Sequence, residues 1–218
     1  KKIHIPVIHV EAGLRSFNEK MPEEVNRILT DRISEILFCP SKAAVQNLKN
    51  EGFDHQPSSY HLVGDIMFDS TKVFSEQAKK SSTILSDLNI QSDFILCTIH
   101  RAETTDHPDK LRELIESINH IHKKHPVILP LHPRTKKIIE QLSINLDAFV
   151  IPPVSYFDML RLLDSCSMVM TDSGGLQKEA YFFQKPCLIL REETEWTELL
   201  DFYRLTGSSK SKIIETYE

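Results

Sequence analysis

The apolar positions of the chain form two blocks, separated by an amphipathic stretch from Asp65 to Lys80 that we interpret as a linker. In the first block, the apolar run from Ile3 to Val10 predicts a buried strand. Pro22-Glu23-Glu24 then predicts a helix start, because proline suits the first helical position and acids favour the first turn. One apolar face of this helix is formed by Val25, Ile28, Leu29 and Ile33.

The rest of the first block predicts a βαβαβ order. Leu37-Phe38-Cys39 is a short strand, and Tyr60 to Val63 is another. Between them, Ser41 is a helix cap and Gly52 ends the same helix. Three strands make a thin sheet, and we expect further sequence upstream.

The second block alternates strands with helices, which predicts a parallel sheet covered on both faces. One helix follows Pro108, and a shorter one runs from Leu176 to Phe183. The predicted strands are Phe94 to Ile99, Val127 to Leu131, Phe149 to Ile151, Met168 to Thr171 and Cys187 to Leu190.

Composition narrows the class of protein. A chain of 218 residues with 40% hydrophobic residues can bury a substantial core. The net charge of -5 gives no reason to expect nucleic acid or an anionic membrane as a partner. The four cysteines are spaced unlike zinc ligands or a redox pair, and no apolar run is long enough for a signal peptide or a membrane span. We therefore expect a cytoplasmic protein with reduced thiols and no metal.

Unusual polar residues follow the predicted strands of the second block. Because ligands bind beyond the carboxyl ends of strands in open α/β sheets, we take these residues as candidates for a binding site. They are His100, Arg101, His132, Arg134, Asp172, Ser173, Gly174, Gly175, Arg191 and Glu195.

The turn Asp172-Ser173-Gly174-Gly175 is the strongest of these candidates. Glycines at a helix start leave backbone N–H groups accessible, and the helix dipole favours an anion there, so the turn predicts a phosphate cradle. The alternative is an ordinary turn with Ser173 as a helix cap. Neither a GxGxxG fingerprint nor a Walker loop is present.

Several side chains could complete such a site. Glu179 could accept hydrogen bonds from ribose hydroxyls, and His100 could exchange a proton near neutral pH. The arginines could bind phosphate, with surface salt bridges as the alternative. In the first block, Glu11 ends a strand, where a buried acid is unfavourable unless it is used. Glu23 is explained by the helix dipole alone unless it lies near Glu11 and Arg27.

Three motifs together resemble the non-hydrolysing UDP-N-acetylglucosamine 2-epimerases. The match is colinear from about Pro6 to Glu195. The motifs are His9-Val10-Glu11-Ala12-Gly13-Leu14-Arg15, Pro22-Glu23-Glu24 with Asn26-Arg27, and Asp172-Ser173-Gly174-Gly175 with Gln177, Glu179 and Ala180.

The resemblance implies an α/β fold with two Rossmann-like domains of glycosyltransferase type B (GT-B) architecture and an active site in the cleft between them. It implies anti elimination of UDP to a 2-acetamidoglucal and re-addition of UDP, without a cofactor. Glu11, Glu23 and His100 match positions for proton transfer and sugar contacts, and Arg27 matches a catalytic-site arginine. The positions that hold the diphosphate and ribose are matched by Ser173, Gly174, Gly175 and Glu179.

The resemblance also implies domain boundaries. Residues 1–68 match part of the N-terminal domain, without the Gly-Thr-Arg-Pro-Glu segment and a catalytic aspartate of the family. Residues 69–218 match the C-terminal UDP-binding domain without its final helical segment. We therefore expect the chain alone to be inactive, and epimerisation by the purified chain would contradict this. A homodimer that supplies surface polysaccharide precursors is expected by analogy.

Two other functions are compatible with these motifs. A glycosyltransferase of the same architecture could use a similar diphosphate turn, but it would need an acceptor site in place of acids around C2. A non-catalytic nucleotide-sugar binder is the second alternative. Trp196 and Met159 replace residues common in the family, so the sequence leaves the choice among UDP-linked 2-acetamido sugars open.

Overall fold

The structure is a computed structural model that describes residues 3–90 and 93–218. The chain divides into two compact units, and helix α3 (Ile66–Ser81) runs from one into the other. The first unit contains Lys1–Asp69 together with Thr194–Glu198, and the second contains Ser70–Glu193 together with Leu199–Glu218.

The first unit has a parallel three-stranded sheet in the order β1-β2-β3, as the βαβαβ pattern predicts. Ser41 caps α2 by accepting a hydrogen bond from the Ala44 N–H, and Gly52 follows the end of that helix with a φ of +79°. The elements are β1 (Ile8–Val10), α1 (Pro22–Ile33), β2 (Ile36–Cys39), α2 (Lys42–Asn50), the 3-10 helix η1 (Phe53–His55) and β3 (Ser59–Leu62).

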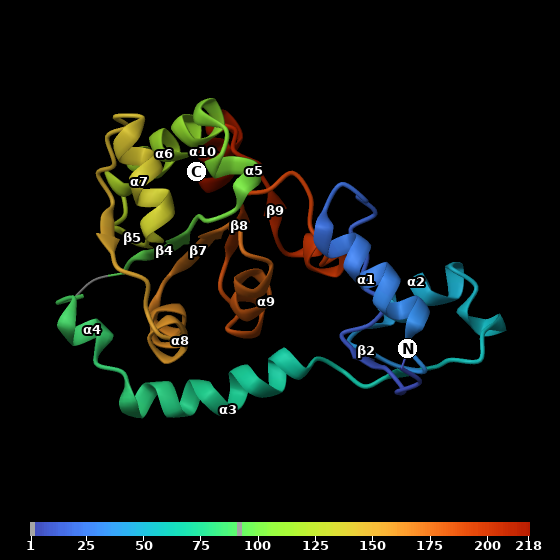
Figure 1. The fold of residues 1–218 in the computed structure, drawn as a ribbon. Helices are drawn as coiled ribbons and strands as arrows, with labels where there is room; N and C mark the ends of the chain where they lie inside the picture. The colour runs from blue at the N-terminus through green and yellow to red at the C-terminus, as the bar shows by residue number, and fades with distance from the viewer. Residues whose placement is uncertain (1–2, 91–92) are drawn as a thin grey trace. The chain divides into compact units, whose positions relative to one another are not determined.

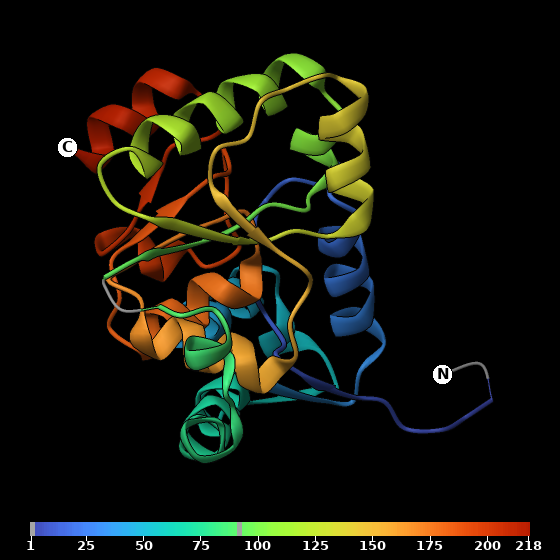
Figure 2. The same cartoon turned by 90° about the vertical axis from the view of Figure 1, so that its left-hand side faces the viewer.

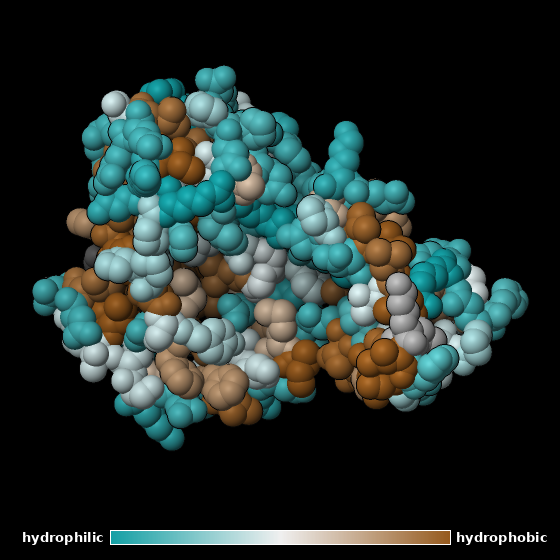
Figure 3. All heavy atoms as spheres, in the orientation of Figure 1, coloured by the Kyte–Doolittle hydropathy of each residue, from teal (hydrophilic) through white to brown (hydrophobic). Residues whose placement is uncertain are grey.

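One expectation for the first unit is wrong in part, and the apolar face of α1 is largely exposed. The predicted strand from Ile3 to Val10 is shorter, and its apolar side chains are exposed rather than buried. In helix α1, the apolar residues Val25, Leu29 and Ile33 are 39%, 59% and 44% exposed, and the fully buried side chains are acidic. Apolar surface is visible over α1 in Figure 3. The physical reason is that an ion network occupies the inner face of this helix, as described below.

The second unit has a six-stranded, all-parallel sheet in the order β6-β5-β4-β7-β8-β9. Helices α6 and α10 cover one face of the sheet, and α8 and α9 cover the other (Figures 1 and 2). The strands are β4 (Ile95–Thr98), β5 (Val127–Pro130), β6 (Phe149–Ile151), β7 (Met168–Thr171), β8 (Cys187–Ile189) and β9 (Arg204–Leu205). The helices are α4 (Ile84–Asp87), α5 (Ala102–Thr105), α6 (Pro108–His122), α7 (Pro133–Gln141), α8 (Tyr156–Ser165), α9 (Gly174–Phe182), the 3-10 helix η2 (Thr197–Asp201) and α10 (Lys210–Tyr217).

The five strands predicted for this unit are confirmed to within two residues at each end. Helix α6 follows the expected pattern, because its apolar side chains are fully buried against the sheet. These side chains are Leu111, Leu114, Ile115, Ile118 and Ile121. The two-residue strand β9 was not predicted, because it is too short to give an alternating pattern.

Candidate functional site

The strand order of the second unit places a topological switch point between β4 and β7. From β4, the chain proceeds outward to β5 and β6, and from β7 it proceeds in the opposite direction to β8 and β9. The loops after β4 and β7 therefore diverge and leave a crevice, which is where ligands bind in open α/β sheets. His100 follows β4, and the turn that begins with Asp172 follows β7.

Asp172 joins these two loops. Its buried carboxylate accepts hydrogen bonds through Oδ2 from the backbone N–H groups of His100 at 2.8 Å and Arg101 at 2.9 Å. The last residues of the two strands are also joined, because the hydroxyl oxygens of Thr98 and Thr171 lie 2.6 Å apart. Asp172 thus holds the loop after β4 in place, and it is itself fully buried.

Asp172 also orients the imidazole of His100. Its Oδ1 lies 3.0 Å from Nδ1 of His100. The nearby Asp172 carboxylate raises the pKa of His100 above its ordinary value, more than burial lowers it. With Nδ1 directed at the carboxylate, Nε2 is the ring nitrogen that can face a ligand. The side chain is 52% exposed, so a ligand can reach it.

The turn after β7 ends in a capped helix start. Ser173 is the N-cap of α9, and its hydroxyl accepts a hydrogen bond from the Leu176 N–H at 3.4 Å. The Ser173 N–H itself donates to the Thr171 hydroxyl at 2.9 Å. Gly174 and Gly175 are the first two helical residues. The helix cap of the alternative interpretation is therefore present, and a helix start capped in this way can still offer backbone N–H groups to an anion.

A cavity of about 390 Å³ lies over this helix start, within the range of small-molecule sites. It brings together candidates from the ends of β4, β5 and β7 that are far apart in sequence. Its lining consists of Thr98, Ile99, His100, Pro130, His132, Pro153, Val154, Met159, Ser173, Gly175, Leu176 and Glu179.

Glu179 is the acidic residue of this cavity lining. Its carboxylate is buried, which raises the pKa of Glu179 above its ordinary value, and a hydrogen bond with Tyr156 lowers it by a smaller amount. Tyr156 was not identified from the sequence. A buried carboxylate that lines a cavity is a strong acceptor for ligand hydroxyls.

The remaining candidates of the second unit lie outside the cavity lining. Arg134 pairs with Asp106 on the surface, and its backbone N–H donates to Nδ1 of His132, the cavity residue that caps α7. Arg101 lies 3.8 Å from Glu103, and Arg191 is buried just beyond β8. Glu195 is buried and groups with the first unit.

In the first unit, Glu11 directly follows β1 and lines a second cavity of about 320 Å³. The other residues that line this cavity are Val10, Phe38, Val63, Gly64, Ile66 and Asp69. The backbone of Glu11 has a φ of +68°, in the left-handed region that non-glycine residues rarely adopt. Such strain persists only where the surroundings impose it, and it is common at functional sites.

Glu23 is exposed in the first turn of α1, and the next residue, Glu24, is fully buried. Glu24 accepts hydrogen bonds from the N–H groups of Ser16 at 3.0 Å and Phe17 at 2.9 Å, and from Nη2 of Arg27 at 2.8 Å. Burial raises the pKa of Glu24, but these hydrogen bonds outweigh it, so its pKa lies below the ordinary value. The partner of Arg27 described here is therefore Glu24, which was not among the candidates.

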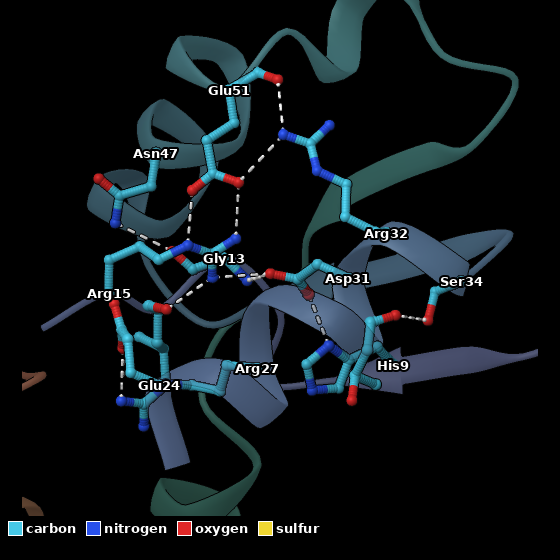
Figure 4. A network of polar contacts seen from close by, with 12 residues as sticks. His9, Gly13, Arg15, Glu24, Arg27, Asp31, Arg32, Ser34, Asn47 and Glu51 are labelled. Carbon is cyan, nitrogen blue, oxygen red and sulfur yellow. Dashed lines mark hydrogen bonds and ion pairs between the residues drawn. The ribbon is translucent and has the colours of Figure 1, made fainter. Parts of the chain in front are cut away.

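A buried ion network surrounds the segment from His9 to Arg15 (Figure 4). The carboxylate of Asp31, 0% exposed, lies 2.6 Å from Nδ1 of His9 and 2.7 Å from Nη1 of Arg15, and it accepts the N–H of Gly13 at 3.2 Å. On its other side, Arg15 donates to Glu51 at 2.6 and 3.0 Å. The spacing of Glu24 and Asp31 places both on one helix face, seven residues apart, which could have indicated their shared burial.

The fold and the cavity at the switch point define a Rossmann-like α/β protein. The family model for UDP-N-acetylglucosamine 2-epimerases matches residues 1–218, and the chain belongs to this family. The predicted family and fold class are thereby confirmed.

Among its relatives, the chain is 49% identical to UDP-2,3-diacetamido-2,3-dideoxy-D-glucuronate 2-epimerase of Pseudomonas aeruginosa, over 99% of this chain and 60% of the relative. It is 41% identical to UDP-N-acetylglucosamine 2-epimerase of Methanococcus maripaludis, over 100% of this chain and 62% of the relative. The chain thus spans about three fifths of the length of these relatives.

Solved structures match the fold as well. The Methanocaldococcus jannaschii UDP-GlcNAc 2-epimerase in complex with UDP-GlcNAc and UDP superposes with a TM-score of 0.90 at 37% identity, over 99% of this chain and 62% of that one. The Neisseria meningitidis enzyme bound to UDP-GlcNAc gives 0.86 at 33% identity, over 99% of this chain and 62% of that one.

Within residues 3–90 and 93–218, no helix is both long and apolar enough to cross a membrane. In the same ranges, no group of three or more His, Cys, Asp or Glu side chains is arranged to hold a metal ion.

Proposed function

We propose that the protein carrying this sequence interconverts the C2 epimers of a UDP-linked 2-acetamido sugar, such as UDP-GlcNAc and UDP-ManNAc. The observation that carries this proposal is the cavity at the switch point, where His100, the start of α9 and Glu179 converge. Family membership and relatives that bind UDP-GlcNAc support it. In this proposal the first unit supplies the catalytic acids and the second unit binds UDP.

The second unit would hold the nucleotide through the start of α9. Backbone N–H groups of Gly174 and Gly175 are suited to the diphosphate, because they combine hydrogen-bond donors with the positive end of the helix dipole. Ser173 would contribute its hydroxyl hydrogen, because its N–H donates to Thr171. Glu179 would accept the ribose hydroxyls, and Asp172 would act by orienting His100. Further contacts to the nucleotide are assigned to Arg101, His132, Arg134, Arg191 and Glu195.

The reaction is an elimination followed by an addition. The C1–O bond breaks with its electron pair passing to the diphosphate, the C2 proton passes to a base, and a C1=C2 double bond forms. UDP then adds back to C1 while a proton returns to the opposite face of C2. No electrons are gained or lost overall, so the balance needs no redox cofactor. We assign Glu11, Glu23 and His100 to proton transfer and sugar contacts, and Arg27 to the catalytic site.

Turnover in deuterated water tests this function. The natural polypeptide that carries this sequence is incubated with UDP-GlcNAc, and the sugar is analysed by NMR. Deuterium at C2 in both epimers is the expected result. Sugar transfer to an acceptor without deuterium at C2 would indicate a glycosyltransferase. Binding of UDP-GlcNAc without any turnover would indicate a nucleotide-sugar binder.

A second candidate substrate of the same reaction is a UDP-linked 2,3-diacetamido glucuronate. It is favoured by the 49% identity to the Pseudomonas aeruginosa enzyme, whose name specifies that sugar. This identity exceeds the 41% to the Methanococcus maripaludis UDP-N-acetylglucosamine 2-epimerase. Comparing kcat/KM for the two UDP-sugars decides between them. A higher value for the diacetamido uronate would assign the chain to that substrate, and a higher value for UDP-GlcNAc would reject it.

We also propose a homodimer in a cytoplasmic setting. The cytoplasmic assignment is supported by the four cysteines, which are all free and buried thiols, as expected of a reducing compartment. The dimer is supported by analogy with the family alone. Sedimentation analysis of the natural polypeptide tests it, with twice the protomer mass as the expected result.

A further inference from the structure

We propose that Asp31 is a positioning residue that fixes the strained segment carrying Glu11 and thereby sets the position of Glu11 relative to Glu23. This inference rests on the proposed function, because it concerns the two acids assigned to the sugar. It adds a role for a residue that itself contacts protein groups.

Contacts from three residues converge on one carboxylate. Three groups from both sides of Glu11 meet at Asp31: Nδ1 of His9, the N–H of Gly13 and Nη1 of Arg15 (Figure 4). Both carboxylate oxygens are used, since Oδ1 binds His9 and Oδ2 binds Gly13 and Arg15. A single buried anion therefore holds the segment before and after Glu11.

The backbone of this segment is strained. Glu11 has a φ of +68°, and Phe17 has a φ of +60°. A left-handed conformation at a non-glycine residue costs about 1 kcal/mol or more, so it needs compensating contacts. Gly13, with a φ of +79°, approaches the backbone oxygen of Ala44 so closely that a Cβ there would lie 2.4 Å from it. The segment therefore packs closely against both α1 and α2.

Both carboxylates that hold this segment, those of Asp31 and Glu24, belong to helix α1. Asp31 and Glu24 occupy the same face of α1, and Glu24 holds the far end of the segment through the N–H groups of Ser16 and Phe17. Glu23 is the neighbour of Glu24 on that helix. Because Asp31, Glu24 and Glu23 belong to the same helix, these contacts fix the position of Glu11 relative to Glu23.

The charges of this network are matched, which explains why so polar an arrangement is buried. Arg15 is almost fully buried and lies between the carboxylates of Asp31 and Glu51. Arg27 pairs with Glu24, and Arg32 lies 3.6 Å from Glu51. A buried ion network of this kind is weak evidence for stability, but it specifies geometry, which is what positioned acids need.

The test compares Asp31→Asn with two control variants of the natural polypeptide. Glu51→Gln removes a charge from the other side of Arg15 and leaves the three contacts of Asp31 intact. Leu37→Ala weakens the apolar core of the same unit and leaves every network side chain in place. Two experiments are run on each variant: amide hydrogen exchange by mass spectrometry, and steady-state kinetics with UDP-GlcNAc that give kcat and KM.

For Asp31→Asn, we expect exchange of residues 12–17 to rise about tenfold or more while exchange in β4 and β5 is unchanged. We expect kcat to fall by about 10- to 100-fold with KM within about threefold of wild type, because the base is misplaced but the nucleotide site is intact. Glu51→Gln and Leu37→Ala are expected to keep kcat within about threefold.

Three results would overturn the proposal. They are unchanged exchange of residues 12–17 in Asp31→Asn, increased exchange with an unchanged kcat, and an equal loss of kcat in Leu37→Ala, which would reduce the role to stability. A wild-type protein without turnover overturns the proposed function instead, and hydrogen exchange then decides by itself whether Asp31 holds the segment.

Discussion

Helices α1 and α6 carry similar apolar patterns but bury different residues. In α6, the apolar side chains pack into the core of the second unit, and all five of them are fully buried. In α1, the buried side chains are Glu24 and Asp31, and Val25, Leu29 and Ile33 are exposed. Helix α6 is therefore held to its unit by apolar packing, whereas α1 is held to its unit by ion pairs and hydrogen bonds of its buried acidic side chains.

The largest effect is expected from removing the centre of the ion network. Asp31→Ala leaves the buried Arg15 with one carboxylate partner fewer, and breaking a buried ion pair typically costs about 3–5 kcal/mol. Urea unfolding followed by fluorescence measures this, because the single tryptophan, Trp196, groups with the first unit. The exposed Glu19→Ala is the control. A loss below about 1 kcal/mol for Asp31→Ala would show that the network does not organise this unit.

The second prediction contrasts the two apolar helix faces directly. Leu114→Ala in α6 should destabilise the second unit by about 2–5 kcal/mol, because a cavity replaces a fully buried side chain. Leu29→Ala in α1 should change the free energy of unfolding by no more than about 0.5 kcal/mol, because Leu29 is 59% exposed. Both are measured by urea unfolding with circular dichroism. Equal losses would remove the difference between the helices.

Gly13 and Gly52 have the same φ of +79° but different surroundings, so replacing each one separates backbone strain from close packing. Gly52→Ala should cost about 1 kcal/mol, because the backbone is strained but nothing lies within 4 Å of the added Cβ. Gly13→Ala should cost about a further 1–3 kcal/mol from overlap with the Ala44 oxygen. Unfolding of the two variants in parallel measures the difference, and similar losses would argue against a tightly packed segment.

The smallest effect concerns the His100–Asp172 pair of the second unit. Asp172 raises the pKa of His100, so the pair stabilises the protein below the ordinary histidine pKa of 6.5, and this stabilisation is lost as pH rises through the raised pKa. Asp172→Asn should therefore lower the pKa of His100, as measured by NMR titration of its ring proton. Asp147→Asn, on the surface, is the control. An unchanged pKa in Asp172→Asn would contradict the pairing.

The sequence predicts the second unit well, because its elements are stabilised locally. Ser173 caps α9, Pro108 begins α6, and the apolar spacing of α6 matches its buried face. Alternating strands and helices then require the parallel sheet, and the parallel sheet brings His100 and Ser173 to one edge.

The first unit was harder to predict because its contacts are polar and distant in sequence. Asp31 binds residues 16 to 22 positions earlier, and Arg15 binds Glu51, which lies 36 positions later. Hydrophobic periodicity predicts which apolar face of a helix is buried. It does not predict the burial of an acidic side chain whose cationic partners are distant in sequence. Tyr156 was missed for the same reason, since its hydrogen bond with Glu179 joins two helices.

Calorimetry of UDP binding tests most directly the claim that the cavity at the switch point holds the nucleotide. Glu179→Ala and His100→Ala are compared with Glu140→Ala, which removes an exposed glutamate from α7 outside the cavity. Loss of a hydrogen bond to a charged group costs about 1.5–3 kcal/mol, so we predict UDP affinity about 10- to 100-fold weaker in the Glu179 variant, weaker affinity in the His100 variant and wild-type affinity in the control. Wild-type UDP affinity in both cavity variants would contradict the account.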